Sequence, residues 1–420
     1  MLVKKYNKHR ETIHNFIWRS LQIGAKQGST FLIFFISARY LDPENLGLFT
    51  YLIAISSLLI IVCDFGFTPS TSKFVAQHKA KGSKSLNRIL FSITVVITGI
   101  ATFVSLFIIF AGKYIFEEYS LLLYFIPYFF FLPLSSVADG AYRGLKDFKK
   151  LSIISLSAAG LALPVSFFLI RNYGLVGSIV SQNLLFFILT AGLFIFRDDI
   201  EFKIDKEVTK NIVGYALVIG LANVAFFLYT KVDILILKQF GFVAEIGYYE
   251  IINKVFTLIL ISSLILGQVV APNITVIFSR NKIGKLLNKF KKYLIFSLLA
   301  GFFIAFLVYF AFPYFIRAFL KDYATDEIIT IFYLLLILLP IKFAGRFMVK
   351  GLVVPSGQAK IVTINTFIFG VANVILDYLF IDIFGFVGVF YSTIIVGILS
   401  FSLNMYLYYN RLIKIRGEGK

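Results

Sequence analysis

The sequence predicts an all-α, polytopic membrane protein that crosses the bilayer about 12 times. The chain is 59% hydrophobic and 15% charged, whereas a soluble domain carries about 25% charged residues. Its mean hydropathy is +0.87, and long apolar runs recur over all 420 residues. Because one span needs roughly 20 apolar residues, a dozen spans and their loops occupy the whole chain. No length remains for a separate catalytic domain.

Apolar runs between charged or Gly- and Pro-containing breakers place the expected spans. The first six lie near residues 13–38, 46–66, 87–112, 119–142, 151–170 and 174–196. The second six lie near residues 210–237, 244–270, 292–317, 328–351, 360–381 and 385–410. Charged residues inside 13–38, 210–237 and 244–270 make these runs less uniformly apolar than 87–112 or 292–317.

Basic residues in the connecting segments predict the orientation. Alternate connections, beginning with the N-terminus, hold about 30 of the 41 Lys and Arg residues. These connections are the N-terminal segment, 73–88, 143–150, 197–210, 280–292, 346–360 and the tail after 410. The other connections hold about six basic residues. Since cytoplasmic loops carry the excess of Lys and Arg, both termini are expected in the cytoplasm.

A weak internal repeat appears at a shift of about 200 residues. Leu46-Gly47-Leu48-Phe49 corresponds to Ile246-Gly247-Tyr248-Tyr249, and Tyr173-Gly174-Leu175-Val176-Gly177 corresponds to Phe384-Gly385-Phe386-Val387-Gly388. We therefore expect two six-helix bundles, residues 1–196 and 211–420, joined by a cytoplasmic linker over 197–210. Parallel repeats of this kind are typical of transporters, although glycine at helix entries also produces such matches by chance.

Several other classes of protein fit poorly. The single Cys63 excludes an intramolecular disulfide, and His9, His14 and His78 have no metal-ligand spacing, so no metal site or catalytic residue is predicted. The basic first ten residues lead into no cleavable signal peptide. A net charge of +19 is explained by cytoplasmic loops without invoking nucleic acid.

The chain resembles the polysaccharide-type flippases of the multidrug/oligosaccharidyl-lipid/polysaccharide exporter (MOP) superfamily. The resemblance covers essentially the whole chain, and it is carried by diffuse motifs. These are Ala38-Arg39-Tyr40-Leu41-Asp42-Pro43-Glu44-Asn45-Leu46-Gly47 with Phe49, then Asp64-Phe65-Gly66, Asp233, and Ile246-Gly247-Tyr248-Tyr249.

The resemblance implies a MATE-like fold and a non-enzymatic transporter of the inner, cytoplasmic membrane. Its cargo would be a polyprenyl-diphosphate-linked oligosaccharide, such as an O-antigen (lipopolysaccharide), capsule or exopolysaccharide repeat unit, moved by alternating access. A polysaccharide polymerase and other assembly proteins are implied partners. Twelve spans suit this branch, whereas the lipid II branch usually has fourteen. No cofactor is implied beyond a coupling H⁺ or Na⁺.

The first expected span carries a polar stripe that suits an anionic head group. Asn15, Arg19, Gln22, Lys26 and Ser29 recur every three or four residues, which places them on one helix face. Guanidinium and ammonium groups are the natural partners of phosphate oxygens. Arg19, Gln22 and Lys26 are therefore predicted to bind the cargo. The alternative is that Arg19, and less easily Lys26, reaches the membrane surface along its apolar stem.

Further cations in the second half extend this prediction. Lys342 and Arg346 lie four residues apart with like charge, so they need an acidic partner, water or an anionic ligand. Lys254 is also predicted to bind the head group, but its spacing from Glu250 equally fits a simple ion pair. The embedded bases and acids are balanced in number, so internal ion pairs and a cationic cavity remain equally compatible with the sequence.

Embedded acids are candidates for ion coupling, because ionisable groups inside a membrane are costly and commonly functional. Asp233 and Asp377 are the deepest, and Glu250 is the third candidate.

Two other functions stay open. A multidrug antiporter of the same superfamily would favour buried acids over bases, and a membrane-embedded polymerase or glycosyltransferase would need larger loops than this chain has.

Overall fold

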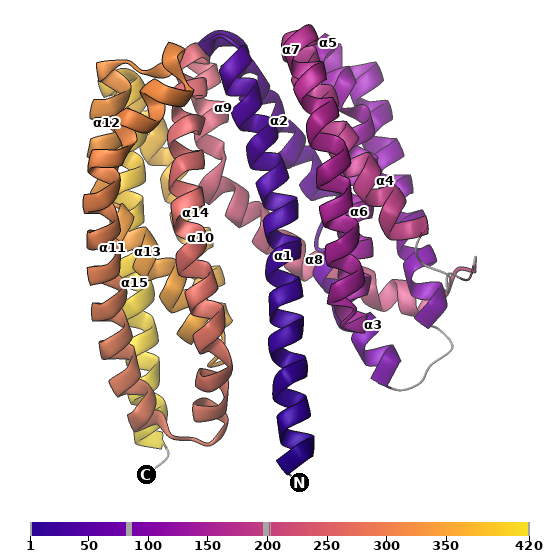
Figure 1. Cartoon of the computed structure of the whole chain (residues 1–420), viewed down its shortest axis with the longest axis vertical. Coiled ribbons are helices and arrows are strands. Elements are labelled where there is room, and N and C mark those ends of the chain that lie inside the picture. Colours follow the sequence, from indigo (N-terminus) through magenta and orange to yellow (C-terminus); the bar gives the residue numbers. More distant parts are fainter. Residues whose placement is uncertain (1, 81–85, 196–200, 202, 419–420) are drawn as a thin grey trace. The chain divides into compact units, whose positions relative to one another are not determined.

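The computed structural model describes residues 2–80, 86–195, 201 and 203–418, and every regular element in these residues is helical. The expected linker residues 197–200 and 202, and the basic residues Lys81, Lys84 and Lys420, lie outside the described residues. Figure 1 shows long helices throughout, which confirms the all-α prediction.

The elements follow one another as a series of long helices with short breaks. The first half contains α1 (Leu2–Tyr40), α2 (Pro43–Asp64), α3 (Phe67–Ala80), α4 (Leu86–Ile115), α5 (Tyr119–Leu122), η1 (Leu123–Phe125), α6 (Ile126–Leu145) and α7 (Phe148–Ile195). The second half contains α8 (Lys206–Thr230), α9 (Val232–Gln239), α10 (Val243–Ser279), α11 (Ile283–Phe319), η2 (Lys321–Tyr323), α12 (Asp326–Leu336), α13 (Leu339–Met348), the π-helix η3 (Val349–Val353), α14 (Ala359–Phe384), η4 (Gly385–Val387) and α15 (Gly388–Glu418).

Within the described residues, eight helical segments are long and apolar enough to cross a membrane, or nine if the bent α12–α13 pair is counted as one. Two of these segments, 148–195 and 359–417, each contain two of the expected spans. In the first, α7 breaks at Gly174, where φ is 51° and ψ is −122°. The polar helix α1 is not one of these eight apolar segments. The chain is a multi-pass membrane protein, while the count of twelve and the cytoplasmic termini remain predictions.

The first compact unit comprises residues 1–41 and 51–224. In this unit α1 packs along α7, and α3 packs against α4 and α6. The unit extends past the expected boundary because the start of α8 joins its core: Val208, Ile212 and Ala216 pack with residues of α3, α4 and α6. The described linker residue Glu201 also forms an ion pair with Arg88 of α4, with Nε and Oε2 2.9 Å apart.

The second compact unit comprises residues 42–50 and 225–420. In Figure 1 the lower parts of α10, α11 and α15 lie side by side in this unit. It also takes in the first turns of α2. Asp42 caps this helix by accepting hydrogen bonds from the backbone N–H of Asn45 (2.8 Å) and from the Asn45 side chain (2.9 Å), and these bonds lower the pKa of Asp42. The two six-helix halves remain a prediction. The boundary between the compact units falls after Val224, and residues 42–50 at the start of α2 belong to the second unit.

Two glycines that correspond in the internal repeat meet in the second unit. A Cβ added to Gly47 of α2 would lie 1.7 Å from the carbonyl oxygen of Val243, and one added to Gly247 of α10 would lie 2.9 Å from that of Pro43. Close approach of two helix backbones requires residues without side chains at such positions. The weak sequence repeat therefore marks a real helix crossing.

We expect Gly47→Ala to destabilise this crossing by about 1–3 kcal/mol, because the new methyl group meets backbone that has to shift. Thermal unfolding of the purified protein in detergent measures the effect. Gly99→Ala is the matched control, because Gly99 of α4 has no atom within 4 Å of an added Cβ. Equal melting temperatures for the two variants would contradict the tight crossing.

Candidate functional site

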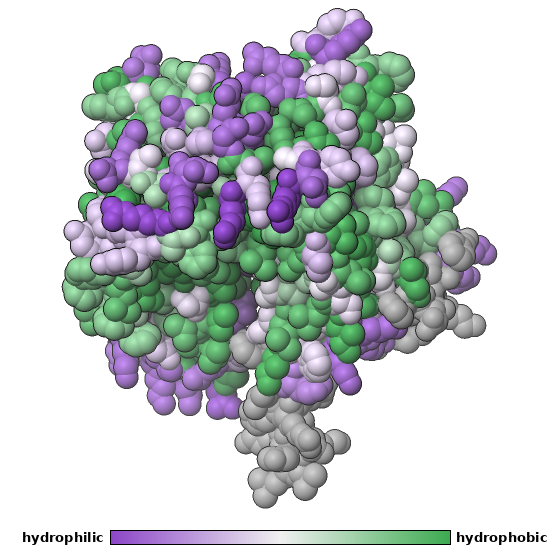
Figure 2. Space-filling model, turned by 45° about the horizontal axis from the view of Figure 1, so that its top comes forward, coloured by the Kyte–Doolittle hydropathy of each residue, from purple (hydrophilic) through white to green (hydrophobic). Residues whose placement is uncertain are grey.

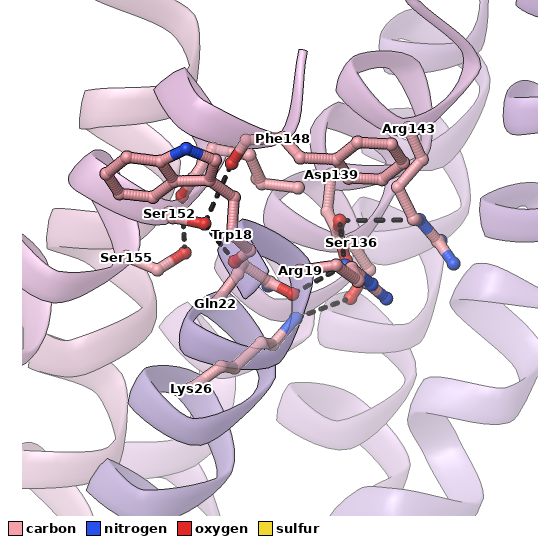
Figure 3. Close-up of polar contacts among 11 residues, drawn as sticks. Trp18, Arg19, Gln22, Lys26, Ser136, Asp139, Arg143, Phe148, Ser152 and Ser155 are labelled. Atoms are coloured by element: carbon pink, nitrogen blue, oxygen red, sulfur yellow. Dashed lines mark hydrogen bonds and ion pairs between the residues drawn. The ribbon is translucent and has the colours of Figure 1, made fainter. Parts of the chain in front are cut away.

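The polar stripe of α1 faces the interior of the first unit. Gln22 and Ser29 are each 2% exposed, and Arg19 and Lys26 are half-buried between them. Figure 3 shows Arg19, Gln22 and Lys26 on one side of α1, pointing toward residues of α6. The predicted periodicity of the stripe is therefore confirmed. Burial also means that Arg19 and Lys26 do not extend freely into water.

A cavity of about 280 Å³ opens along this stripe. Its lining comes from three helices of the first unit, namely α1, α6 and α7. The lining residues are Arg19, Gln22, Ile23, Lys26, Gln27, Thr30, Asp139 and Phe186. The polar side chains are mostly cationic, amide or hydroxyl groups, with one carboxylate. Such a lining can bind an anion and donate hydrogen bonds to neutral polar groups beside it.

Asp139 of α6 is shared between two arginines. Its Oδ1 atom lies 3.3 Å from a terminal nitrogen of Arg19 and 3.3 Å from Nε of Arg143 (Figure 3). Arg19 also donates a 2.5 Å hydrogen bond to Gln22. Arg143 follows Asp139 by one helical turn on α6, whereas Arg19 joins the pair from 120 residues away in the sequence. One carboxylate thus faces two guanidinium groups.

Lys26 adds a further positive charge with no carboxylate within ion-pair distance in the described residues. Its Nζ donates only a long hydrogen bond of 3.5 Å to Ser136 and lies 5.6 Å from the centre of the Phe186 ring. Neither Ser136 nor Phe186 had a signal in the sequence. The cluster of Arg19, Lys26, Arg143 and Asp139 therefore carries a net positive charge, and Lys26 is its least neutralised member.

In the second unit, Glu250 of α10 lies between two lysines. Its Oε1 atom is 3.0 Å from Nζ of Lys231 and 3.2 Å from Nζ of Lys254, and the residue is 4% exposed. The simple pairing of Lys254 with Glu250 that the sequence left open is present. Lys231, at the break between α8 and α9, adds a second lysine to the pair.

Lys342 and Arg346 of α13 show a different pattern. Lys342 is half-buried and Arg346 is exposed, and neither forms an ion pair or a hydrogen bond within the described part of the chain. Their like charges lie one helical turn apart, and no carboxylate of the described residues lies within ion-pair distance of either, although the charge of Asp233 acts on Lys342 from farther away. This pair thus keeps the character of an anion-binding element that the sequence suggested.

The two deepest acids, Asp233 of α9 and Asp377 of α14, lie close together in the second unit. The side-chain amide of Asn373 donates to both, at 2.6 Å to Asp233 and 3.1 Å to Asp377. The Tyr249 hydroxyl donates to Asp233, and the Ser392 hydroxyl donates to Asp377. The two acids are 4% and 0% exposed, and no Lys or Arg pairs with them among the described residues.

No group of three or more His, Cys, Asp or Glu side chains in the described residues could hold a metal ion. The carboxylate pair with its Asn, Tyr and Ser partners does offer several oxygen atoms in a buried space. Such a set can accept a proton or surround a small hard cation. Of the predicted coupling residues, Asp233 and Asp377 therefore lie together, whereas Glu250 belongs to the separate lysine cluster.

Comparison with known proteins identifies one matching sequence family and several solved structures that share the fold. A family model described as "Polysaccharide biosynthesis protein" matches residues 12–278. No curated protein sequence matches the chain significantly. Among solved structures, the inward-facing conformation of a multidrug resistance MATE family transporter of the MOP superfamily matches with a TM-score of 0.82 at 15% identity, over 96% of this chain and 99% of that chain.

Two further solved structures share the fold. The lipid II flippase MurJ in an inward closed conformation has a TM-score of 0.73 at 19% identity, over 94% of this chain and 89% of that chain. A MOP superfamily transporter from Pyrococcus furiosus, described as having a binding pocket of reverse polarity, has a TM-score of 0.58 at 13% identity, over 97% and 96% of the two chains. The MATE-like fold expected from the sequence is confirmed.

Proposed function

The chain belongs to the polysaccharide biosynthesis protein family, and from this premise we propose that it is a flippase for lipid-linked oligosaccharides. It carries a polyprenyl-diphosphate-linked repeat unit between the leaflets of the cytoplasmic membrane by alternating access. No covalent bond is made or broken. The repeat unit belongs to an O-antigen, a capsule or an exopolysaccharide, and a polysaccharide polymerase receives it.

The observation that carries this proposal is the positive charge of the α1 cavity. A diphosphate needs cationic donors, and the cavity offers Arg19 and Lys26, with a single carboxylate opposite them. Gln22, Gln27 and Thr30 line the same cavity and supply amide and hydroxyl groups for the adjoining sugar. Lys342, Arg346 and Lys254 of the second unit are proposed as further head-group contacts.

The buried carboxylates support a coupling role. Two negative charges in an apolar interior are costly without a counter-charge, so Asp233 and Asp377 are suited to take up H⁺ or Na⁺ during the cycle. Glu250 is a weaker candidate because Lys231 and Lys254 already neutralise it.

The second candidate function is a cation-coupled multidrug antiporter. The acid pair and the fold shared with a MATE transporter favour it. The positive cavity argues against it, since an organic cation would be repelled by Arg19 and Lys26. A polymerase or glycosyltransferase has no support from a metal site, because no group of three or more His, Cys, Asp or Glu side chains in the described residues could hold a metal ion.

A reconstituted system distinguishes these functions. Vesicles that contain the full chain receive a fluorescent polyprenyl-diphosphate oligosaccharide, and an impermeant quencher reports the label in the outer leaflet. We expect protein-dependent movement of this lipid, and none of a matched polyprenyl glycoside without phosphate. Movement equal to that in protein-free vesicles, together with export of an organic cation under an ion gradient, would replace the flippase with the antiporter.

A further inference from the structure

Helices α14 and α15 of the second unit pack along each other, and the faces that meet carry polar side chains. Each helix contributes three residues spaced four and eight positions apart, a spacing that places them on one helix face. These residues, each at most 7% exposed, are Asn365, Asn373, Asp377, Ser392, Ser400 and Asn404. We call this set the polar seam. In Figure 1, α15 continues past the seam to the marked C-terminus.

The outward face of α14 is apolar, in contrast to the seam. Its residues that are at least 46% exposed include Ile364, Phe367, Ile375 and Leu379. Figure 2 shows a broad band of hydrophobic residues on the visible outer surface, above hydrophilic residues along the lower left edge. Polar groups buried among apolar ones cost free energy unless they are hydrogen-bonded, and inside membrane helices they are commonly functional.

At one end the polar seam contains half of the acid pair. Asp377 accepts hydrogen bonds from the Ser392 hydroxyl and from Asn373, and the Asn373 amide also donates to Asp233. Toward the C-terminus of α15, Val396 follows Ser392 by one turn and is 2% exposed. An apolar residue therefore separates the acid pair from the rest of the seam along α15.

The second part of the polar seam reaches the acid pair by way of α8. The Nδ2 atom of Asn365 donates to Ser400, at 2.7 Å to its hydroxyl oxygen and 3.2 Å to its carbonyl oxygen. The Tyr229 hydroxyl of α8 also interacts with the Ser400 side chain. Asp233 lies four residues after Tyr229, and its charge acts on the Tyr229 hydroxyl. Tyr229 thus provides a polar group between the two parts of the seam.

Two amide oxygens of the polar seam have no donor. The Oδ1 atoms of Asn365 and Asn404 are buried and accept no hydrogen bond from the described residues. Leaving such an acceptor unpaired costs about 1–3 kcal/mol. Asn404 lies one helical turn after Ser400, the partner of Asn365. A ligand that fits both oxygens has to donate hydrogen bonds, and water, which donates two, commonly pairs with such buried groups.

We propose that the polar seam holds internal water at Asn365 and Asn404, and that this water connects the acid pair, through Tyr229, with the C-terminal end of α15. The inference rests on the coupling role proposed for Asp233 and Asp377, because a buried pair exchanges an ion only where a path reaches it. Water passes protons along its hydrogen bonds, and the hydroxyl and amide oxygens of the seam also suit Na⁺. The basic segments predict that this end is cytoplasmic.

Radiolytic hydroxyl labelling of the full chain in detergent tests for the water, because radicals formed from bound water oxidise buried side chains beside it. Tyr408 is the reporter, since it lies one turn after Asn404 and a helical side chain points back over the preceding turn. Tyr323 is the matched control, because both tyrosines are 0% exposed. We expect oxidation of Tyr408 to be at least about fivefold faster than that of Tyr323, and Asn404→Leu to remove the difference.

The quencher assay in vesicles tests the connection to the acid pair. In Asn404→Leu the ratio of lipid movement with and without an ion gradient should fall toward one. Asn404→Ser keeps a hydroxyl oxygen for the water and should retain most of the response. Asn183→Leu is the matched control: Asn183 is 8% exposed and its Oδ1 is likewise unpaired among the described residues, but it lies in the first unit. Equal melting temperatures establish that the variants fold.

Equal oxidation of Tyr408 and Tyr323 in the wild type would overturn the internal water, and this measurement needs no variant. A gradient response in Asn404→Leu as large as that in Asn183→Leu would overturn the connection to the acid pair. Lipid movement equal to that in protein-free vesicles would remove the flippase function instead, and faster oxidation of Tyr408 would then still support the water.

Discussion

Lys26→Gln should slow the leaflet movement of the diphosphate-linked lipid by about tenfold to a hundredfold. A hydrogen bond to a charged group is worth about 1.5–3 kcal/mol, and Lys26 has no carboxylate partner in the described residues to share that energy. Removing it therefore takes contact energy from the cargo and leaves no newly unpaired acid. Lys26→Arg keeps the charge and should retain most of the rate. The quencher assay in vesicles measures both.

Lys149→Gln is the control, because Lys149 is an exposed lysine of α7 outside the cavity. Arg19→Gln is less informative, since it also frees Asp139 to pair with Arg143 alone. If Lys26 served only to reach the membrane surface, Lys26→Gln and Lys149→Gln would transport at the same rate. That result, at equal amounts of reconstituted protein, would remove Lys26 from the cargo site.

The sequence predicted the polar face of α1 because helical periodicity is a local property. It could not predict what this face contacts. The pairing of Arg19 with Asp139 joins residues 120 positions apart, and the Lys26 contacts with Ser136 and Phe186 depend on how α6 and α7 pack. The embedded acids and bases are equal in number over the whole sequence, but basic residues are in excess around the α1 cavity. The sequence could not predict this excess, because the charge of a site depends on which residues are neighbours in three dimensions.

Helix boundaries show the same division between local and tertiary causes. The basic and polar residues of 73–88 predict a connecting loop, yet α3 continues as a helix to Ala80. Its stability comes from packing on α6, where Gly140 and Gly144 allow close approach: an added Cβ would lie 2.5 Å from the Thr68 carbonyl oxygen and 2.7 Å from that of Ser72. No pattern within the segment itself reports these contacts. The sequence does predict a connection between the spans 151–170 and 174–196, and the structure has its break there because Gly174 readily adopts a positive φ.

The sequence also identified Asp233 and Asp377 by depth alone, without indicating that they meet. Their contact depends on Asn373, which lies one turn before Asp377 on α14 and reaches both carboxylates. The hydroxyl donors Tyr249 and Ser392 come from α10 and α15. Four helices thus contribute to one polar cluster, and this convergence makes the pair a stronger candidate for coupling than Glu250.

Asp377→Asn should abolish the response of transport to an imposed ion gradient. The amide has the shape of the carboxylate and keeps an oxygen for the Ser392 hydroxyl, but it accepts neither a coupling proton nor the charge of Na⁺. In wild-type vesicles, a gradient of the coupling ion should accelerate net lipid movement. In the variant the ratio of rates with and without the gradient should fall to about one, while binding of the cargo persists.

Imposing proton and sodium gradients separately identifies the ion, because only one of them should accelerate the wild type. Asp382→Asn is the matched control: Asp382 lies on the same helix, five residues after Asp377, but is exposed. It should respond to the gradient as the wild type does. Asp377 is fully buried beside Asp233, and no Lys or Arg of the described chain forms an ion pair with either acid. Removing one carboxylate therefore removes a repulsion between like charges and should not unfold the protein. A gradient response that survives in both Asp377→Asn and Asp233→Asn would therefore assign coupling elsewhere.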